Sequence, residues 1–345
     1  MIPERSSGTT PVPGTMHLFF EGYSTECKYF EKIEQSRLKL VEKPKFFLKP
    51  EPRDLSQISA SDPRDVLNFL KDTKKWIESD DRDVCPIDLF IIKYLSKAAE
   101  TNNRLHDELY PEQDNKGERY NPKFDRFNEL KDELTKLFSQ FDLIENGSVH
   151  VRKTKKVADW FMNNEYPGYD ILFGVEDIIP EDTEGEDYYC MIIDRDQFSR
   201  NRKHLPEIYD ECRDNGYHLV ITNPYFELWL ALHTKKYDPD KMLEFINKYL
   251  EVYSCGKTTK EQRDSVGPIG YLNEYLTKND RVNKKNKIVY KKNKMNYPFI
   301  NKEGLREAIV NLKNYYQTDL EKVINKISSE DKSALGSNIL DIIVG

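Results

Sequence analysis

The sequence predicts an α/β protein in which helices flank a central parallel sheet. Near the N-terminus, two apolar strand patterns are each followed by a helical pattern, and this order favours parallel pairing. The same alternation returns after a long interruption. Acidic residues directly follow two of the predicted strands, at the edge where α/β sheets bind their ligands. The 345 residues are enough for one large domain or two modest ones.

The first predicted strand is the apolar run His17–Phe20, which lies between Gly14 and Gly22. A helix is expected from about Thr25, with Ser24 or Thr25 as its N-cap, because a hydroxyl oxygen accepts hydrogen bonds from the first helical amides. The run Lys45–Leu48 predicts the second strand. The next helix opens at Ser61-Asp62-Pro63, because proline is tolerated at the first helical position.

The alternation resumes with a predicted strand over Tyr188–Ile193. A helix over Arg202–Asn215 follows, and Gly216 is the residue expected to close it, because glycine readily adopts the left-handed conformation. A further strand is predicted over Tyr217–Thr222. After it, Pro224 is expected to open a strongly apolar helix that includes Phe226–His233. These elements form the second half of the predicted sheet.

The two halves are separated by a segment, 80–187, that we interpret as a mainly helical insertion. Apolar residues recur at helical spacing over Pro86–Ala99 and Phe127–Phe141, and Lys153–Asn163 is a further helix candidate. The insertion ends in an acidic stretch, Glu165–Asp187, with nine carboxylates and no Lys or Arg. We expect that stretch to be an exposed loop.

The remainder of the chain is predicted to be helical. Helices are expected up to Ile300 and again over Lys302–Ile327, and the apolar run Ile339–Val344 is either a helix end or an edge strand. The predicted organisation is a flexible leader (1–14), a first half of the sheet domain (15–79), the insertion (80–187), a second half (188–256) and a basic helical C-terminal region (257–345).

Composition restricts the class of protein. No run of about 18 apolar residues is present, and Met1–Gly14 lacks the apolar core of a signal peptide, so we expect neither a membrane span nor export. The five cysteines contain no Cys-x-x-Cys pair and are odd in number, which disfavours a zinc knuckle and a disulfide framework. We therefore expect a cytoplasmic protein with reduced thiols. The oligomeric state stays open.

Three carboxylates are the candidate catalytic and metal-binding residues. Glu21 follows the first strand, and Asp194 and Asp196 follow the strand that ends at Ile193. If the chain stays extended, the side chains of Asp194 and Asp196 point to the same side. Such a cluster repels itself unless a cation neutralises it, and hard oxygen ligands suit Mg²⁺ or Mn²⁺. The alternatives are a surface turn at Glu21 and a solvated Asp-x-Asp loop.

The segment Asn223–His233 also follows a strand and adds three candidate residues. Glu227 stands in the first helical turn, where it either takes part in a site or stabilises the helix dipole. Asn223 is either a substrate contact or a helix cap. His233 is about 600° from Glu227 around the helix, so the two need not act together.

A basic stretch is the candidate nucleic-acid-binding region. Although the net charge is −7, the segment from Lys257 to Lys302 has twelve basic and four acidic residues. Lysine binds phosphate and tyrosine stacks on unpaired bases. The candidate contacts are Lys284, Lys285, Lys287, Tyr290, Lys291, Lys292 and Lys294. The alternative is a solvated basic loop.

Together the motifs resemble the RloB-like family. They are a strand ending in Glu-Gly-x-x-Thr-Glu-x-x-Tyr-Phe (Glu21–Phe30), a strand ending in Asp-x-Asp (Asp194 and Asp196), and Asn-Pro-x-Phe-Glu-Leu-Trp-Leu-x-Leu-His (Asn223–His233). This family is placed in the Toprim superfamily and includes the AbiLii component of AbiL abortive-infection systems. The resemblance implies a Rossmann-like Toprim sheet, with Glu21 as the acid/base glutamate and Asp194 and Asp196 as the metal-holding pair.

The resemblance also carries an expected function. Glu26, Asn223, Glu227 and His233 fall on the family's own motif positions, without a defined role. RloB-like proteins are usually paired with an ABC or SMC-like ATPase in phage-defence loci. The expectation is a Mg²⁺-dependent nuclease, the toxic effector of such a system, with RNA, including tRNA, narrowly favoured over DNA. The alternatives are a non-catalytic subunit of an ATPase complex and a topoisomerase- or primase-type Toprim enzyme.

Overall fold

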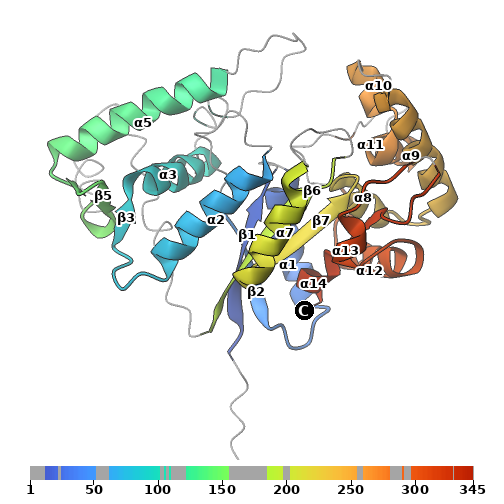
Figure 1. Ribbon diagram of the computed structural model, residues 1–345, viewed down its shortest axis with the longest axis horizontal. Helices are drawn as coiled ribbons and strands as arrows, with labels where there is room; N and C mark the ends of the chain where they lie inside the picture. The colour runs from blue at the N-terminus through green and yellow to red at the C-terminus, as the bar shows by residue number, and fades with distance from the viewer. Residues whose placement is uncertain are drawn as a thin grey trace, which may run out of the picture.

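The computed structural model describes residues 12–21, 25–51, 62–101, 105, 109, 122–154, 185–196, 203–254, 259–279, 290, 297–328 and 330–344. Their centre is a five-stranded sheet in the order β2-β1-β6-β7-β8. The strands are β1 (Gly14–Phe20), β2 (Phe46–Pro50), β6 (Asp187–Asp194), β7 (His218–Asn223) and β8 (Gly336–Ser337). Figure 1 shows this sheet between two groups of helices.

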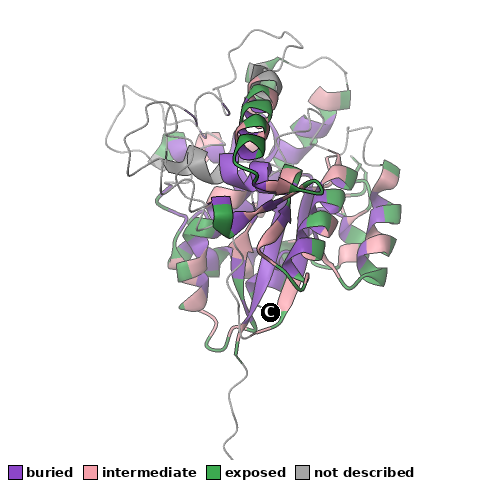
Figure 2. Cartoon of the chain, turned by 90° about the vertical axis from the view of Figure 1, so that its left-hand side faces the viewer, coloured by how far each residue is buried: buried purple, intermediate pink, exposed green. Residues whose placement is uncertain are grey.

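The register of the sheet brings the ends of β1, β6 and β7 to one edge. β1 pairs in parallel with β2 and with β6, and β6 pairs in parallel with β7. Only the short β8 runs antiparallel, on the outer side of β7. The predicted α/β fold with a mostly parallel sheet is therefore confirmed. The central strands β1, β6 and β7 are mostly buried, as Figure 2 shows.

Alternate side chains of the strands enter two separate cores. Met16, Leu18 and Phe20 of β1 point to the face that one group of helices covers. These helices are α1 (Thr25–Leu38), α8 (Glu227–Leu232), α9 (Pro239–Ser254), α11 (Gly267–Asn279) and α12 (Lys302–Tyr315). Because both faces of the central strands are buried, these strands are continuous apolar runs rather than alternating ones.

The opposite face packs against helices from both halves of the sequence. Phe19, Met191 and Ile221 share a core with α2 (Pro63–Ile77) and α7 (Leu205–Asp214). The same core includes the described part of the predicted insertion, with α3 (Ile87–Thr101), α5 (Pro122–Gln140) and a small antiparallel sheet of β3 (Val84–Pro86), β5 (Ser148–His150) and β4 (Ile144–Glu145). The domain boundaries themselves stay predictions.

Local sequence explains where several of these elements begin and end. The side chain of Asp62 accepts a hydrogen bond from the amide of Arg64, and Pro63 is the first helical residue of α2. Gly216 follows α7 with φ of +70°, the left-handed conformation expected of a residue after a helix. Most of the predicted helix Lys153–Asn163 and most of the acidic stretch lie outside the described residues.

The C-terminal region differs from the prediction. The helix expected over Lys302–Ile327 is two helices, because α12 ends at Tyr315 and a separate α13 spans Leu320–Val323. Asp319 caps the second helix by accepting a hydrogen bond from the amide of Glu321. The last apolar run forms a short helix, α14 (Leu340–Ile343), and β8 just before it supplies the edge strand. The short α10 (Lys260–Asp264) precedes α11.

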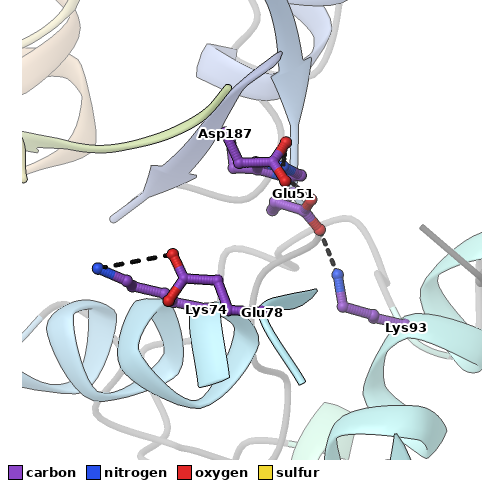
Figure 3. A network of polar contacts seen from close by, with 6 residues as sticks. Glu51, Lys74, Glu78, Lys93 and Asp187 are labelled. Carbon is purple, nitrogen blue, oxygen red and sulfur yellow. Dashed lines mark hydrogen bonds and ion pairs between the residues drawn. The ribbon is translucent and has the colours of Figure 1, made fainter. Parts of the chain in front are cut away.

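A buried polar network joins the insertion to the sheet (Figure 3). His17 of β1 lies between two carboxylates, with Nδ1 at 2.7 Å from Glu51 and Nε2 at 3.3 Å from Asp187. Lys93 of α3 forms an ion pair with the second oxygen of Glu51. The buried Glu51 therefore pairs with the lysine cation and with the imidazole ring of His17, and the lysine ties α3 to the end of β2.

None of the helices described is both long and apolar enough to cross a membrane.

Candidate functional site

Glu21 and Asp194 meet at the carboxyl edge of the sheet. Phe20 of β1 is paired with Ile192 of β6, and the amide of Glu21 continues the ladder with a 3.2 Å hydrogen bond to the Ile192 carbonyl. The amide of Asp194 donates a 3.3 Å hydrogen bond to Oε2 of Glu21. Two acidic residues that are 173 positions apart in sequence are thus in contact at this edge, through the backbone of one and the carboxylate of the other.

Asp194 is also fixed by the helix that follows β7. Its Oδ1 accepts a 2.7 Å hydrogen bond from the amide of Phe226, directly before α8 begins at Glu227. Phe226 has no side-chain cap of its own, so the carboxylate of another strand satisfies this amide. Asp194 therefore has a structural role in addition to any role in chemistry.

Asp196 does not continue the strand. β6 ends at Asp194, and Asp196 has φ of +37°, so the assumption of an extended Asp194–Asp196 segment is wrong. The reason is hydrogen bonding beyond the strand: the Arg195 amide donates to the Thr222 carbonyl over 2.8 Å, and the Asp196 amide donates to the Pro224 carbonyl over 2.9 Å. Within the described ranges, no three His, Cys, Asp or Glu side chains converge as metal ligands.

The donor set nevertheless fits a magnesium ion. Glu21 and Asp194 are half-buried, and they provide hard oxygen atoms at an edge that solvent and ligand can reach. Mg²⁺ in proteins is commonly held by only one or two carboxylates, with water and substrate phosphates as its other ligands. A pair of carboxylates is therefore sufficient for a Mg²⁺ site that a phosphate completes.

Asn223 is neither a helix cap nor exposed to a substrate. Its side chain is fully buried at the end of β7. Both of its amide donations go to carbonyl oxygens of the C-terminal region, Val323 at 2.9 Å and Asn325 at 2.8 Å. Of the two alternatives considered for Asn223, the helix cap is not the one found, because Phe226 is the residue directly before α8. The Asn223 amide group bonds instead to a segment about 100 residues downstream.

Arg195 contacts the same segment. It stands between the two aspartates, and its Nε donates a 2.7 Å hydrogen bond to the Ile324 carbonyl. The carbonyls of Val323, Ile324 and Asn325 thus all accept hydrogen bonds from residues at the carboxyl edge. Sequence reasoning missed this contact, because no local pattern identifies a backbone acceptor so far away.

Glu227 lies inside the core beside the basic region. It is 2% exposed, and the Tyr290 hydroxyl donates to its Oε1 over 3.2 Å. Burial, together with the charge of Glu227, holds the pKa of Tyr290 well above its ordinary value. Tyr290 is itself buried, which leaves little ring surface for stacking on a base. The six predicted lysine contacts, Lys284, Lys285, Lys287, Lys291, Lys292 and Lys294, lie outside the described residues.

The two remaining motif residues are also buried. Glu26 is in the first turn of α1. His233 follows α8, and its Nδ1 lies 3.0 Å from the Trp229 carbonyl, so this nitrogen donates and Nε2 accepts from the Tyr29 hydroxyl at 3.0 Å. Burial lowers the pKa of His233 to about 4. His233 is therefore neutral near pH 7, and its contacts are those of a core residue.

The fold and this edge define a class of protein: a Rossmann-like α/β protein with a carboxylate pair at the carboxyl ends of adjacent parallel strands. The model of the RloB-like protein family matches residues 16–339, which is nearly the whole chain. The chain belongs to the RloB-like family. Comparison with curated proteins and with solved structures gave no match.

Proposed function

We propose that this protein is a Mg²⁺-dependent nuclease. The observation that carries the proposal is the contact between Glu21 and the amide of Asp194, which brings two carboxylates to the ligand-binding edge of a parallel sheet. The basic stretch after Lys257 provides charge for a phosphate-bearing substrate. RNA, including tRNA, is the preferred substrate, narrowly over DNA.

In this mechanism Asp194 and Glu21 would hold the ion, together with Asp196 if its side chain turns toward them. A bound Mg²⁺ supplies Lewis-acid chemistry, which stabilises the charge that develops on the scissile phosphate. The hydrogen bond from the Phe226 amide fixes one oxygen of Asp194. Glu21, which is half-buried, orients the attacking water or accepts its proton.

We further propose that the protein is the toxic effector of an anti-phage abortive-infection system, controlled by an ABC or SMC-like ATPase. Family membership supports this proposal, since it matches the expectation drawn from the sequence motifs. Neighbouring genes provide an independent check. An adjacent gene for such an ATPase supports the defence context, and its consistent absence in related genomes contradicts it.

Cleavage assays test the nuclease proposal. The purified protein is incubated with tRNA and with plasmid DNA in Mg²⁺ or Mn²⁺, alone and with the ATPase. The matched variants are Asp194→Asn and Glu21→Gln, because each amide oxygen can still accept the hydrogen bond seen here while the charge is lost. Cleavage should be lost in both variants, as should toxicity in cells. If neither substrate is cut under any of these conditions, the proposal is wrong.

One observation favours a second candidate, a non-catalytic subunit that docks on an ATPase. Asp194 accepts the amide that opens α8, so a carboxylate at this position has a structural explanation. If the protein is such a subunit, Asp194→Asn and Glu21→Gln keep toxicity and ATPase binding. If it is a nuclease, both variants still bind the ATPase but are no longer toxic.

A further inference from the structure

Three consecutive backbone carbonyls attach the C-terminal region to the acidic edge, which is the carboxyl edge of the sheet at Glu21 and Asp194. The Val323 and Asn325 carbonyls accept hydrogen bonds from the Asn223 amide, and the Ile324 carbonyl accepts one from Arg195. These carbonyls stand at and after the end of α13, where a helix leaves carbonyl groups without intrahelical partners. Their partners come from the residues that directly follow β6 and end β7.

The attached segment is anchored at both ends. Val323 is fully buried, and Ile327 is 2% exposed. Between these two anchors, Lys326 is exposed. The backbone around this lysine is therefore fixed by burial and by hydrogen bonds, while its charged end reaches solvent.

Lys326 also differs from Lys322, the nearest lysine in the sequence. Lys322, on α13, lies 3.9 Å from the carboxylate of Asp319. Among the residues described, no ion pair is found for Lys326. Only Asn325 separates it from Ile324, so the backbone of Lys326 lies within about 7 Å of the carbonyl that accepts from Arg195. A lysine side chain spans several more ångströms, so its charge can meet a phosphate beside the acidic edge.

We propose that residues 323–326 form one wall of the nucleic-acid site, with Lys326 as a phosphate-binding residue and with Asn223 and Arg195 as the positioning residues that hold the wall. This inference rests on the proposed nuclease function. It adds a positively charged residue to a substrate site that has so far been described by its carboxylates. A carboxylate pair repels the phosphate backbone, so a cation held at fixed distance offsets that repulsion. It contributes affinity without sequence preference.

Binding without cleavage tests the role of Lys326. A fluorescent single-stranded RNA, and DNA of the same sequence, are titrated with the full chain in EDTA over a series of salt concentrations. Lys326→Glu should weaken binding about tenfold and reduce the slope of log K against log salt by about 0.7. Lys322→Glu is the matched control, because it makes the same charge change on the same exposed segment. It should alter binding by no more than about twofold.

A double-mutant comparison tests the positioning role. Lys326→Glu is repeated in Asn223→Asp, which turns an acceptor toward the two carbonyls, and in Arg195→Ala; circular dichroism establishes which of these variants are folded. In a folded variant that no longer holds residues 323–326 in place, the effect of Lys326→Glu on nucleic-acid binding should shrink to that of Lys322→Glu. An undiminished effect in either folded variant overturns the positioning role.

The outcomes separate this inference from the proposed function. Equal effects of Lys326→Glu and Lys322→Glu, or no effect of the former, overturn the inference while nuclease activity stands. RNA or DNA that binds through Lys326 but is never cut leaves the inference standing and contradicts the nuclease proposal. A wild-type chain that binds neither nucleic acid contradicts both.

Discussion

The backbone amide of Asp194 donates a 3.3 Å hydrogen bond to the carboxylate of Glu21, across the ends of two adjacent parallel strands. The carboxylate of Asp194 in turn accepts a hydrogen bond from the Phe226 amide at the start of α8. The acidic edge is therefore part of a continuous hydrogen-bonded path from β1 through β6 to the helix after β7. Changes at Asp194 affect folding and chemistry together, and the two effects have to be separated.

Paired substitutions at Asp194 separate them. Asp194→Ala leaves the Phe226 amide without its acceptor, so we expect the free energy of unfolding to fall by about 1–3 kcal/mol. Asp194→Asn retains an acceptor and should lose less than about 1 kcal/mol. Urea unfolding followed by circular dichroism measures both. Equal losses in the two variants would show that this hydrogen bond does not stabilise the fold.

Asn223 should be among the most sensitive positions for stability. Asn223→Ala removes one buried and one partly buried hydrogen bond and leaves the Val323 and Asn325 carbonyls with one partner fewer, so a loss of about 2–4 kcal/mol is expected. The control is Asn215→Ala, since Asn215 is exposed and makes a single bond to the Glu211 carbonyl. That change should cost under about 0.5 kcal/mol. Similar losses at both positions would contradict the structural role of Asn223.

An ion pair between Arg37 and Glu34 covers the outer edge of β2. Loss of this pair is therefore expected to let the protein associate with itself through that edge. Arg37 is fully buried, its Nη2 donates to the outward carbonyl of Phe46, and its partner Glu34 accepts from the Leu48 amide at 3.0 Å. Arg37→Ala should leave Glu34 uncompensated, destabilise the fold by about 3–5 kcal/mol and expose a pairing edge.

Light scattering checks the association, and urea unfolding checks the stability. Arg64→Ala is the control, because Arg64 pairs with Glu207 at an exposed position, where an ion pair contributes under about 1 kcal/mol. A soluble Arg37→Ala protein of unchanged size and stability would show that the pair does not protect the edge.

The polar network around His17 predicts how stability depends on pH. Burial alone would lower the pKa of His17, but the hydrogen bonds to Asp187 and Glu51 outweigh it, and the pKa is raised above 6.5. Burial would raise the pKa of Glu51, but the charge of Lys93 and the bond to His17 hold it far below 4.5. The hydrogen bond from His17 also lowers the pKa of Asp187.

The two shifts act in opposite directions along the pH scale. The raised His17 pKa stabilises the fold fully below pH 6.5, and this contribution is lost as pH rises through the folded value. The lowered Glu51 pKa stabilises it above pH 4.5, and that contribution is lost as pH falls. The network therefore contributes most between about pH 4.5 and 6.5. Urea unfolding across pH should show a decline above this window that His17→Gln abolishes; an unchanged profile in that variant contradicts the assignment.

The sequence predicts those features of the fold and site that depend on neighbouring residues or on strand order. It does not predict those that depend on hydrogen bonds to distant backbone groups. Strand and helix patterns predict the sheet, and the rule that parallel strands end at one edge brings Glu21 to Asp194. The turn at Asp196 was not predicted, and the two alternatives considered for Asn223 did not include its bonds to Val323 and Asn325, because both features depend on backbone groups far along the chain. The amides of Arg195 and Asp196 donate hydrogen bonds to the carbonyls of Thr222 and Pro224. The Asn223 side chain donates to the carbonyls of Val323 and Asn325.

The most direct test of the central claim is Mn²⁺ binding to the intact protein, measured by isothermal titration calorimetry in the absence of substrate. The account predicts a site in the wild type that is lost in both Asp194→Asn and Glu21→Gln, while Glu207→Gln, at an exposed ion pair, leaves it unchanged. Circular dichroism confirms that each variant is folded. Unaltered Mn²⁺ binding in the two folded variants at the acidic edge would contradict the claim that this carboxylate pair holds the metal.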